Sequence, residues 1–154
     1  MKVLFVCTGN SCRSPMASAM LKKMAQEEGL DIDVDSCGSE AFLGLKISKE
    51  TSDVLRREGM GRLDYKSKPL NKQLIDWADI ILVMENRHRL RIMEEGPGAE
   101  KKTYLLTEFA NAESREIVDP IGKPLEVYEG LFMDLKFYLV KVLERIKNES
   151  SAGQ

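Results

Sequence analysis

A cysteine and an arginine mark the two ends of a short loop near the start of the chain. The loop follows the apolar run Val3–Val6 and, with its flanks, reads Cys7-Thr8-Gly9-Asn10-Ser11-Cys12-Arg13-Ser14-Pro15. Ser14 as a helix N-cap and Pro15 as the first helical residue predict that a helix begins directly after the loop. Backbone N–H groups that converge at a helix N-terminus attract an anion, and phosphate has the charge and the acceptor oxygens for such a site.

The side chains at the two ends of this loop are those that phosphoryl transfer needs. Arg13 carries a planar guanidinium that can bind two phosphate oxygens at once. The field that holds an anion also favours the thiolate of Cys7, so we expect a nucleophilic sulfur at neutral pH. Taken alone, Cys7 would fit a buried core position, because cysteine is among the most buried residue types. The C-x5-R-S spacing between a strand and a helix favours the phosphate site, and the lysine of a nucleotide P-loop is missing.

The composition is that of one globular domain, with 154 residues of which 43% are hydrophobic and 31% charged. A net charge of -2 gives no general attraction to nucleic acid, so anion binding must be local. No apolar stretch reaches the roughly 20 residues that cross a membrane, and no export segment precedes the loop, so we expect a cytoplasmic protein. Three cysteines and one histidine argue against a disulfide framework and a zinc site.

Apolar runs alternate with helical patterns along the chain. Runs at 2–6, 80–84 and 103–106 predict buried strands, and the alternating segment 32–36 predicts an edge strand. Helices are expected from Pro15 to Gly29 and over 48–59, 71–78, 86–95 and 125–147. This order predicts an α/β fold, a single-domain doubly wound four-stranded parallel sheet with helices on both faces. We place the domain at 1–148, followed by a loose polar tail at 149–154. Ligands bind beyond the carboxyl ends of such strands, where Cys7 lies.

Cleavage of a phosphoester also needs a proton donor for the leaving oxygen. The only histidine, His88, lies among arginines on a predicted surface helix, so we expect it to be solvated and give it no role. Asp119 is the alternative, because Pro120 restricts it to an extended backbone and thereby fixes the direction of its carboxyl group. Asp-Pro is also a common turn, and the dipeptide alone favours that interpretation.

The segment Leu4–Pro15, together with Asp119-Pro120, resembles the low-molecular-weight protein tyrosine phosphatases over nearly the whole chain. The resemblance implies that Cys7 is the nucleophile, Arg13 the phosphate clamp, and Asp119 first the acid and then the base. It also implies that Asn10 holds the loop shape and that Ser14 hydrogen-bonds the thiolate. The remaining phosphate-binding positions are Thr8, Gly9, Ser11 and Cys12. A phosphocysteine would then form and be hydrolysed without a metal or cofactor.

Several residues near the expected site bear on the substrate. Family members that act on phosphotyrosine carry a branched aliphatic residue at the position of Ser11, whereas the protein-arginine phosphatases carry threonine. Ile121 stands where many relatives have an aromatic residue, and Tyr65 where they often have a histidine in a supporting hydrogen-bond network. Ser11 is small and hydroxylic and so resembles the arginine branch more. From the family resemblance as a whole we predict a phosphoprotein phosphatase of the phosphotyrosine type, with a protein-arginine phosphatase as the alternative.

The chain has two other cysteines, Cys12 and Cys37. The resemblance implies a reversible disulfide between Cys7 and Cys12 that protects the thiolate, and a small buried side chain at Cys12 is the alternative. Cys37 is interpreted as a packing residue.

Two other function classes share the loop. An arsenate reductase of this fold relays electrons through two further cysteines, and no cysteine follows Cys37. A phosphate-binding module without turnover needs only the loop and Arg13, so Asp119 distinguishes it from an enzyme. For the enzyme we expect phosphorylated proteins as partners, no nucleic acid, no membrane and a monomer.

Overall fold

The computed structural model describes residues 1–60 and 64–153, and its centre is a parallel sheet. The strands are β1 (Lys2–Cys7), β2 (Asp33–Gly38), β3 (Ile80–Val83) and β4 (Thr103–Leu105). Their order is β2-β1-β3-β4, and all pairs are parallel. The predicted α/β sheet is therefore confirmed, and β2 is an edge strand as expected.

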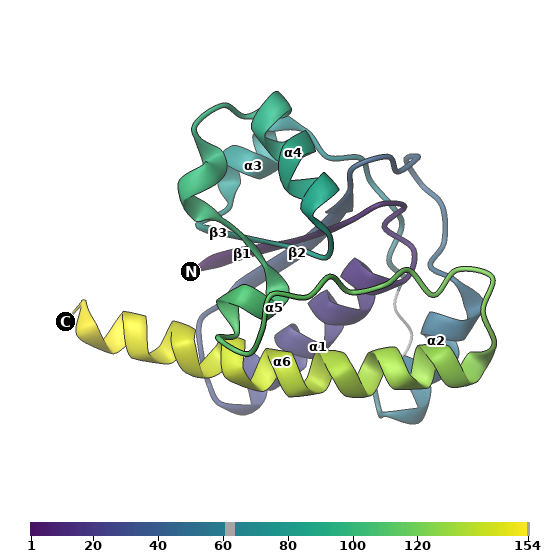
Figure 1. Cartoon of the computed structure of the whole chain (residues 1–154). Helices are drawn as coiled ribbons and strands as arrows, with labels where there is room; N and C mark the ends of the chain where they lie inside the picture. Colours follow the sequence, from purple (N-terminus) through teal and green to yellow (C-terminus); the bar gives the residue numbers. More distant parts are fainter. Residues whose placement is uncertain (61–63, 154) are drawn as a thin grey trace.

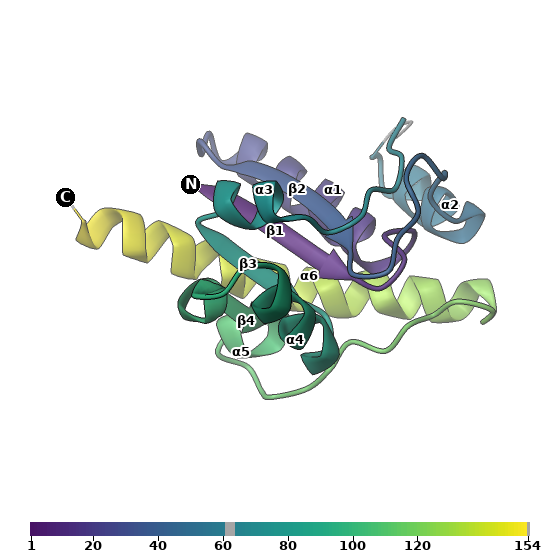
Figure 2. The same ribbon diagram turned by 90° about the horizontal axis from the view of Figure 1, so that it is seen from above.

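Helices cover both faces of the sheet (Figures 1 and 2). On one face lie α1 (Arg13–Glu27) and the long α6 (Leu125–Ala152), with α2 (Lys49–Arg57) and the short α5 (Leu106–Phe109) beside them. On the other face lie α3 (Lys72–Trp77), α4 (Asn86–Glu95) and the 3-10 turn η1 (Ala99–Lys102). The fold is thus doubly wound.

The central strand β1 contributes side chains to the hydrophobic layers on both faces of the sheet. Successive side chains of a strand point to opposite faces, so Val3 and Phe5 pack toward α1 and α6, whereas Leu4 and Val6 pack toward α3 and α4. All four are fully buried. Because β1 is hydrogen-bonded on both sides, its carboxyl end, where Cys7 lies, is held rigidly.

Two predicted boundaries were wrong. The helix after the loop begins at Arg13 with Cys12 at the N-cap position, so Ser14 is not the cap. Its hydroxyl lies beside the sulfur of Cys7 instead. The segment predicted as a loose tail continues α6 as far as Ala152. Polar residues extend a helix when they form i,i+4 pairs, and Arg145 and Glu149 form one at 2.9 Å.

In the portion of the chain that the structure describes, none of the helices has the length and apolarity needed to span a membrane.

Candidate active site

The loop from Cys7 to Arg13 connects the end of β1 to the start of α1. Three of its carbonyl groups accept hydrogen bonds from residues outside the loop. The carbonyl oxygens of Cys7, Thr8 and Ser11 accept hydrogen bonds from the N–H groups of Ser39 (2.8 Å), Glu40 (3.0 Å) and Ser48 (2.9 Å). In a trans peptide the N–H group points away from the carbonyl. The N–H groups that follow these three carbonyls therefore turn to the inner side of the loop, where an anion would be bound.

Gly38 lets the end of β2 lie directly against this loop. A Cβ atom at position 38 would lie 2.5 Å from the carbonyl oxygen of Thr8 and 2.9 Å from the backbone nitrogen of Asn10. No side chain fits there without moving the backbone of the loop. The close approach fixes the loop against a strand of the central sheet.

Asn10 makes four side-chain hydrogen bonds on the inner side of the loop. It is fully buried and has the left-handed φ of 54°. Its Nδ2 donates to Ser14 Oγ (2.8 Å) and Ser36 Oγ (3.0 Å), and its Oδ1 accepts from the Tyr65 hydroxyl (2.6 Å) and the Lys68 N–H (3.0 Å). With two donors and two acceptors satisfied, the amide has a single orientation.

Tyr65 belongs to the hydrogen-bond network around Asn10, the place that the family resemblance gave it. Its hydroxyl is 2.6 Å from Asn10 Oδ1, and Ser36 Oγ donates to it at 2.7 Å. Burial raises the pKa of Tyr65 to about 12. The phenol therefore remains a neutral donor over the physiological range, whereas a histidine at this place would titrate.

The same network ends at the sulfur of Cys7. The Ser14 hydroxyl accepts from Asn10 Nδ2, and its own hydrogen has two acceptors within reach, Cys7 Sγ at 2.9 Å and the carbonyl oxygen of Cys37 at 3.4 Å. Cys7 is 2% exposed. An O–H donor and inward N–H groups thus surround a buried sulfur.

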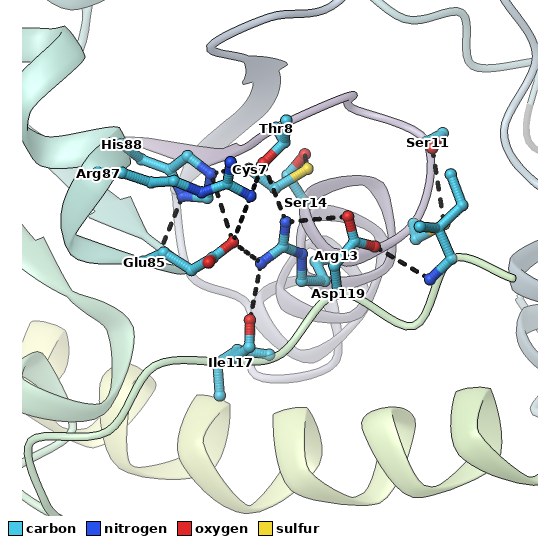
Figure 3. Close-up of polar contacts among 12 residues, drawn as sticks. Cys7, Thr8, Ser11, Arg13, Ser14, Glu85, Arg87, His88, Ile117 and Asp119 are labelled. Atoms are coloured by element: carbon cyan, nitrogen blue, oxygen red, sulfur yellow. Dashed lines mark hydrogen bonds and ion pairs between the residues drawn. The ribbon is translucent and has the colours of Figure 1, made fainter. Parts of the chain in front are cut away.

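The guanidinium of Arg13 is almost completely buried, with 1% of its surface exposed. Its Nη1 donates to Glu85 Oε2 (2.6 Å) and to the carbonyl oxygen of Ile117 (2.7 Å), and its Nη2 donates to Thr8 Oγ1 (3.2 Å) (Figure 3). These contacts compensate the burial of the charge and fix the plane of the guanidinium.

Sequence reasoning missed Glu85. Burial by itself would raise the pKa of this carboxyl, but hydrogen bonds from Arg13 and Arg87 hold it below its usual value. Glu85 is therefore an anion at neutral pH. The sequence did hold a signal for it, because Glu85 comes two residues after the end of β3 and the carboxyl ends of neighbouring parallel strands meet at one edge of the sheet.

The prediction for His88 was wrong, because the ring is fully buried. Its Nδ1 accepts the backbone N–H of Glu85 at 3.1 Å, and its Nε2 lies 2.9 Å from Thr8 Oγ1. Since Nδ1 accepts, the ring proton is on Nε2, which donates to Thr8. Burial, and next the charge of Arg13, lowers the pKa of His88 to about 4, so the ring is neutral at pH 7. His88 occupies the third helical position of α4, where its side chain accepts the backbone N–H of the N-cap residue Glu85.

Asp119 lies beside the guanidinium of Arg13, on the segment between α5 and α6 (Figure 3). Its Oδ2 is 3.6 Å from Arg13 Nη2, and its Oδ1 accepts the N–H of Ile121 at 3.1 Å. The segment is attached to the sheet where the Ile117 N–H donates to the carbonyl oxygen of Met84 at 2.8 Å. About a third of the Asp119 side chain is exposed, so the carboxyl group is open to solvent and to a substrate.

Cys12 and Cys37 are both buried free thiols. Cys12 Sγ lies 3.5 Å from Ser48 Oγ and 3.7 Å from the hydroxyl of Tyr128. The disulfide between Cys7 and Cys12 stays a prediction. Cys37 is a packing residue in the layer of α3 and α4, as expected, and burial raises the pKa of its thiol.

Within residues 1–60 and 64–153, no three His, Cys, Asp or Glu side chains gather as ligands for a metal ion. The described residues instead bring together a thiol, the inward N–H groups of one loop, a buried arginine and an open carboxyl group next to that arginine.

Comparisons with known proteins agree with this chemistry. The family model described as low molecular weight phosphotyrosine protein phosphatase matches residues 2–152. The protein-arginine-phosphatase of Geobacillus stearothermophilus is 37% identical over 148 residues, which are 96% of this chain and 97% of that protein. The low molecular weight protein-tyrosine-phosphatase PtpB of Staphylococcus haemolyticus is 31% identical over 146 residues, which cover 92% and 97% of the two chains.

A solved structure of the YwlE arginine phosphatase aligns with a TM-score of 0.90 at 30% identity and covers 96% of each chain. It is a cysteine-to-serine mutant, and its active-site serine is phosphorylated.

Proposed function

This chain belongs to the low molecular weight phosphotyrosine protein phosphatase family, and from that premise we propose that it dephosphorylates protein phosphoarginine through a phosphocysteine at Cys7. The family consists of cysteine-based hydrolases, so the chain is a phosphatase. The observation that carries the proposed role of Cys7 is its place beside the Ser14 hydroxyl, 2.9 Å away, at the base of inward N–H groups. The phosphorylated serine in the YwlE mutant supports a phosphoryl group bound covalently at this position.

In the first step the Cys7 thiolate attacks phosphorus, and the bond from phosphorus to the leaving atom breaks. Asp119 gives its proton to the leaving atom. The loop N–H groups and the guanidinium of Arg13 bind the three equatorial oxygens, whose charge they stabilise in the transition state. The Ser14 hydroxyl, which stabilises the thiolate in the free enzyme, remains beside the sulfur.

In the second step the Asp119 carboxylate takes a proton from water, and the water oxygen attacks phosphorus. The bond between sulfur and phosphorus breaks, the electron pair returns to Cys7, and inorganic phosphate leaves. The same N–H groups and Arg13 stabilise this transition state. The cycle closes with Asp119 protonated again and needs no redox partner.

Phosphoarginine is favoured as the substrate by the acceptors near the loop. Its guanidinium is a planar set of N–H donors, and Ser11 supplies a hydroxyl oxygen while the protonated carboxyl group of Asp119 supplies its carbonyl oxygen. Figure 3 shows Ser11 and Asp119 on one side of Arg13, with Glu85 and His88 on the other. The similarity to the Geobacillus stearothermophilus protein-arginine-phosphatase supports the same choice.

Phosphotyrosine is the second candidate. Ile121 follows Asp119-Pro120 with 65% of its side chain exposed, so it offers an apolar contact for an aromatic ring. The relative PtpB, named a protein-tyrosine-phosphatase, supports this alternative.

The substrate proposal is tested with two peptides of identical sequence that carry phosphoarginine or phosphotyrosine. A hydrogen bond to a charged group contributes about 1.5–3 kcal/mol, so Ser11→Ile should lower kcat/KM for phosphoarginine about tenfold or more. The added apolar surface should leave phosphotyrosine hydrolysis equal or faster. Ser150→Ile, an exposed position near the end of α6, is the control and should leave the ratio unchanged.

An unchanged preference in Ser11→Ile would refute the role of this side chain. The mechanism is tested by Cys7→Ser, which should abolish hydrolysis while phosphate still binds. Tight phosphate binding by the native protein with no hydrolysis would instead indicate a binding module.

A further inference from the structure

A second guanidinium lies beside that of Arg13 and shares both of its acceptors. Arg87, in the first turn of α4, donates from Nη2 to Thr8 Oγ1 at 2.9 Å and to Glu85 Oε2 at 3.1 Å. Arg13 donates to the same two oxygens. Arg13 is buried, whereas 55% of the Arg87 side chain is exposed. In Figure 3 the two arginines reach Glu85 from different sides.

The hydroxyl of Thr8 has more donors around it than it can accept. Its oxygen has two lone pairs, yet three N–H donors approach it, from Arg13 (3.2 Å), Arg87 (2.9 Å) and His88 (2.9 Å). Arg13 and His88 are fixed by burial. Arg87 is the one of these three donors with a largely exposed side chain, so it is the one that a ligand can reach.

Arg87 also has unused donors. A guanidinium has five N–H donors, and in the described part of the chain both hydrogen bonds of Arg87 come from Nη2. The hydrogen bond to Glu85 raises the pKa of Arg87, so the group is always charged. Its tether to Thr8 and Glu85 holds the side chain in place, which reduces the entropy lost when a ligand binds.

We propose that Arg87 is a specificity-determining residue that binds the carboxylate of an acidic residue next to the phosphorylated residue of the substrate protein. The inference rests on the proposed phosphatase function and adds a recognition element to it. The phosphoryl oxygens are bound by the loop and by Arg13, so the exposed edge of Arg87 is available for a different anion. A planar carboxylate matches that edge, because a guanidinium binds it through two parallel N–H···O bonds.

The test compares phosphopeptides that differ at one residue, Glu or Gln, placed in turn at each position adjacent to the phosphorylated residue. Both phosphoarginine and phosphotyrosine series are used. We expect the native enzyme to prefer the Glu peptide about five- to tenfold in kcat/KM at one of these positions, mainly through KM. The preference should shrink as salt is added, because the contact lies at the surface.

In Arg87→Gln the Glu-to-Gln ratio should fall to about one. The ratio is taken within one enzyme, so a general loss of rate does not affect it. Arg87→Lys, which keeps the charge but not the paired donors, should give an intermediate ratio. Arg91→Gln is the matched control, since Arg91 lies on the same helix and pairs with Glu94 and Glu95 away from the loop.

Equal hydrolysis of Glu and Gln peptides by the native enzyme would overturn the role of Arg87 and leave the phosphatase proposal standing. So would a Glu preference that survives in Arg87→Gln. No hydrolysis of any phosphopeptide or aryl phosphate by the native protein would overturn both proposals.

Discussion

Acidification should destabilise the folded protein through His88 alone by an amount that can be calculated. Its pKa is about 4 in the folded state, against 6.5 for an unperturbed histidine. Between these values the unfolded chain binds more protons than the folded one, so stability rises with pH. The stabilisation is fully present above pH 6.5 and is lost as pH falls toward 4. At 1.36 kcal/mol for each pH unit, the complete loss is about 3 kcal/mol, of which about 2 kcal/mol falls between pH 7 and pH 5.

The variant that isolates this effect is His88→Gln. A glutamine at the third position of a helix can accept the N–H of the N-cap residue, which is the bond that His88 Nδ1 makes with Glu85. Its amide can also donate toward Thr8, but it does not titrate. His88 is the only histidine in the sequence, so no other imidazole titrates in this pH range.

The assay is urea unfolding at pH 5, 6 and 7 under reducing conditions, with stability obtained by linear extrapolation. Carboxyl groups make the same contribution to the pH dependence of unfolding in the native protein and in His88→Gln. The difference in pH dependence between the two proteins is therefore due to His88. The native protein should lose about 2 kcal/mol more than His88→Gln between pH 7 and pH 5. If the two proteins lose the same stability, the buried ring is not held neutral, and the orientation of its hydrogen bonds derived above is wrong.

Two further substitutions test the support of the loop. Tyr65→Phe removes the hydroxyl that bonds Asn10 and Ser36 and should lower both kcat and stability, the latter by about 1–2 kcal/mol. The control is Tyr104→Phe, which loses one exposed hydrogen bond of 3.3 Å to the carbonyl oxygen of Lys101, so its kcat and stability should stay near native. Equal effects of the two substitutions would contradict the role of Tyr65. Gly38→Ala should abolish phosphate binding or folding, because its Cβ would lie 2.5 Å from the Thr8 carbonyl oxygen. Gly130→Ala, with no atom within 4 Å, should stabilise α6 by about 0.5–1 kcal/mol, as urea unfolding and phosphate titration would show.

The loop could be predicted from the sequence because its determinants are local. A buried strand, a glycine, an arginine at fixed spacing and a helix start lie within one run of residues, and Pro120 restricts Asp119 in the same local way. The boundary at Ser14 was misplaced because a hydroxyl that could cap the helix bonds to the Cys7 sulfur instead. Such competition between partners depends on tertiary contacts that the sequence does not display.

Glu85, Arg87 and His88 show the opposite case. They lie in a polar, arginine-rich segment whose composition is that of a solvated helix face, yet Glu85 and His88 bond to residues near the start of the chain. Their position follows from the pairing of β3 with β1, which brings the segment that follows β3 next to the loop that follows β1. Periodicity indicates which residues form a strand, but it does not say which strand ends become neighbours.

The unequal contacts of Arg13 with two carboxyl groups explain why the proposed mechanism assigns proton transfer to Asp119. Glu85 lies 2.6 Å from Arg13 Nη1, and hydrogen bonds from Arg13 and Arg87 keep it anionic at neutral pH. A group held in that state cannot give a proton to a leaving atom, but it neutralises the buried guanidinium permanently. Asp119 lies 3.6 Å from Arg13 Nη2, and a third of its side chain is exposed, so substrate and water can reach it while Arg13 stays in place. In the proposed mechanism Glu85 therefore compensates the charge of Arg13, and Asp119 carries out the acid step and then the base step.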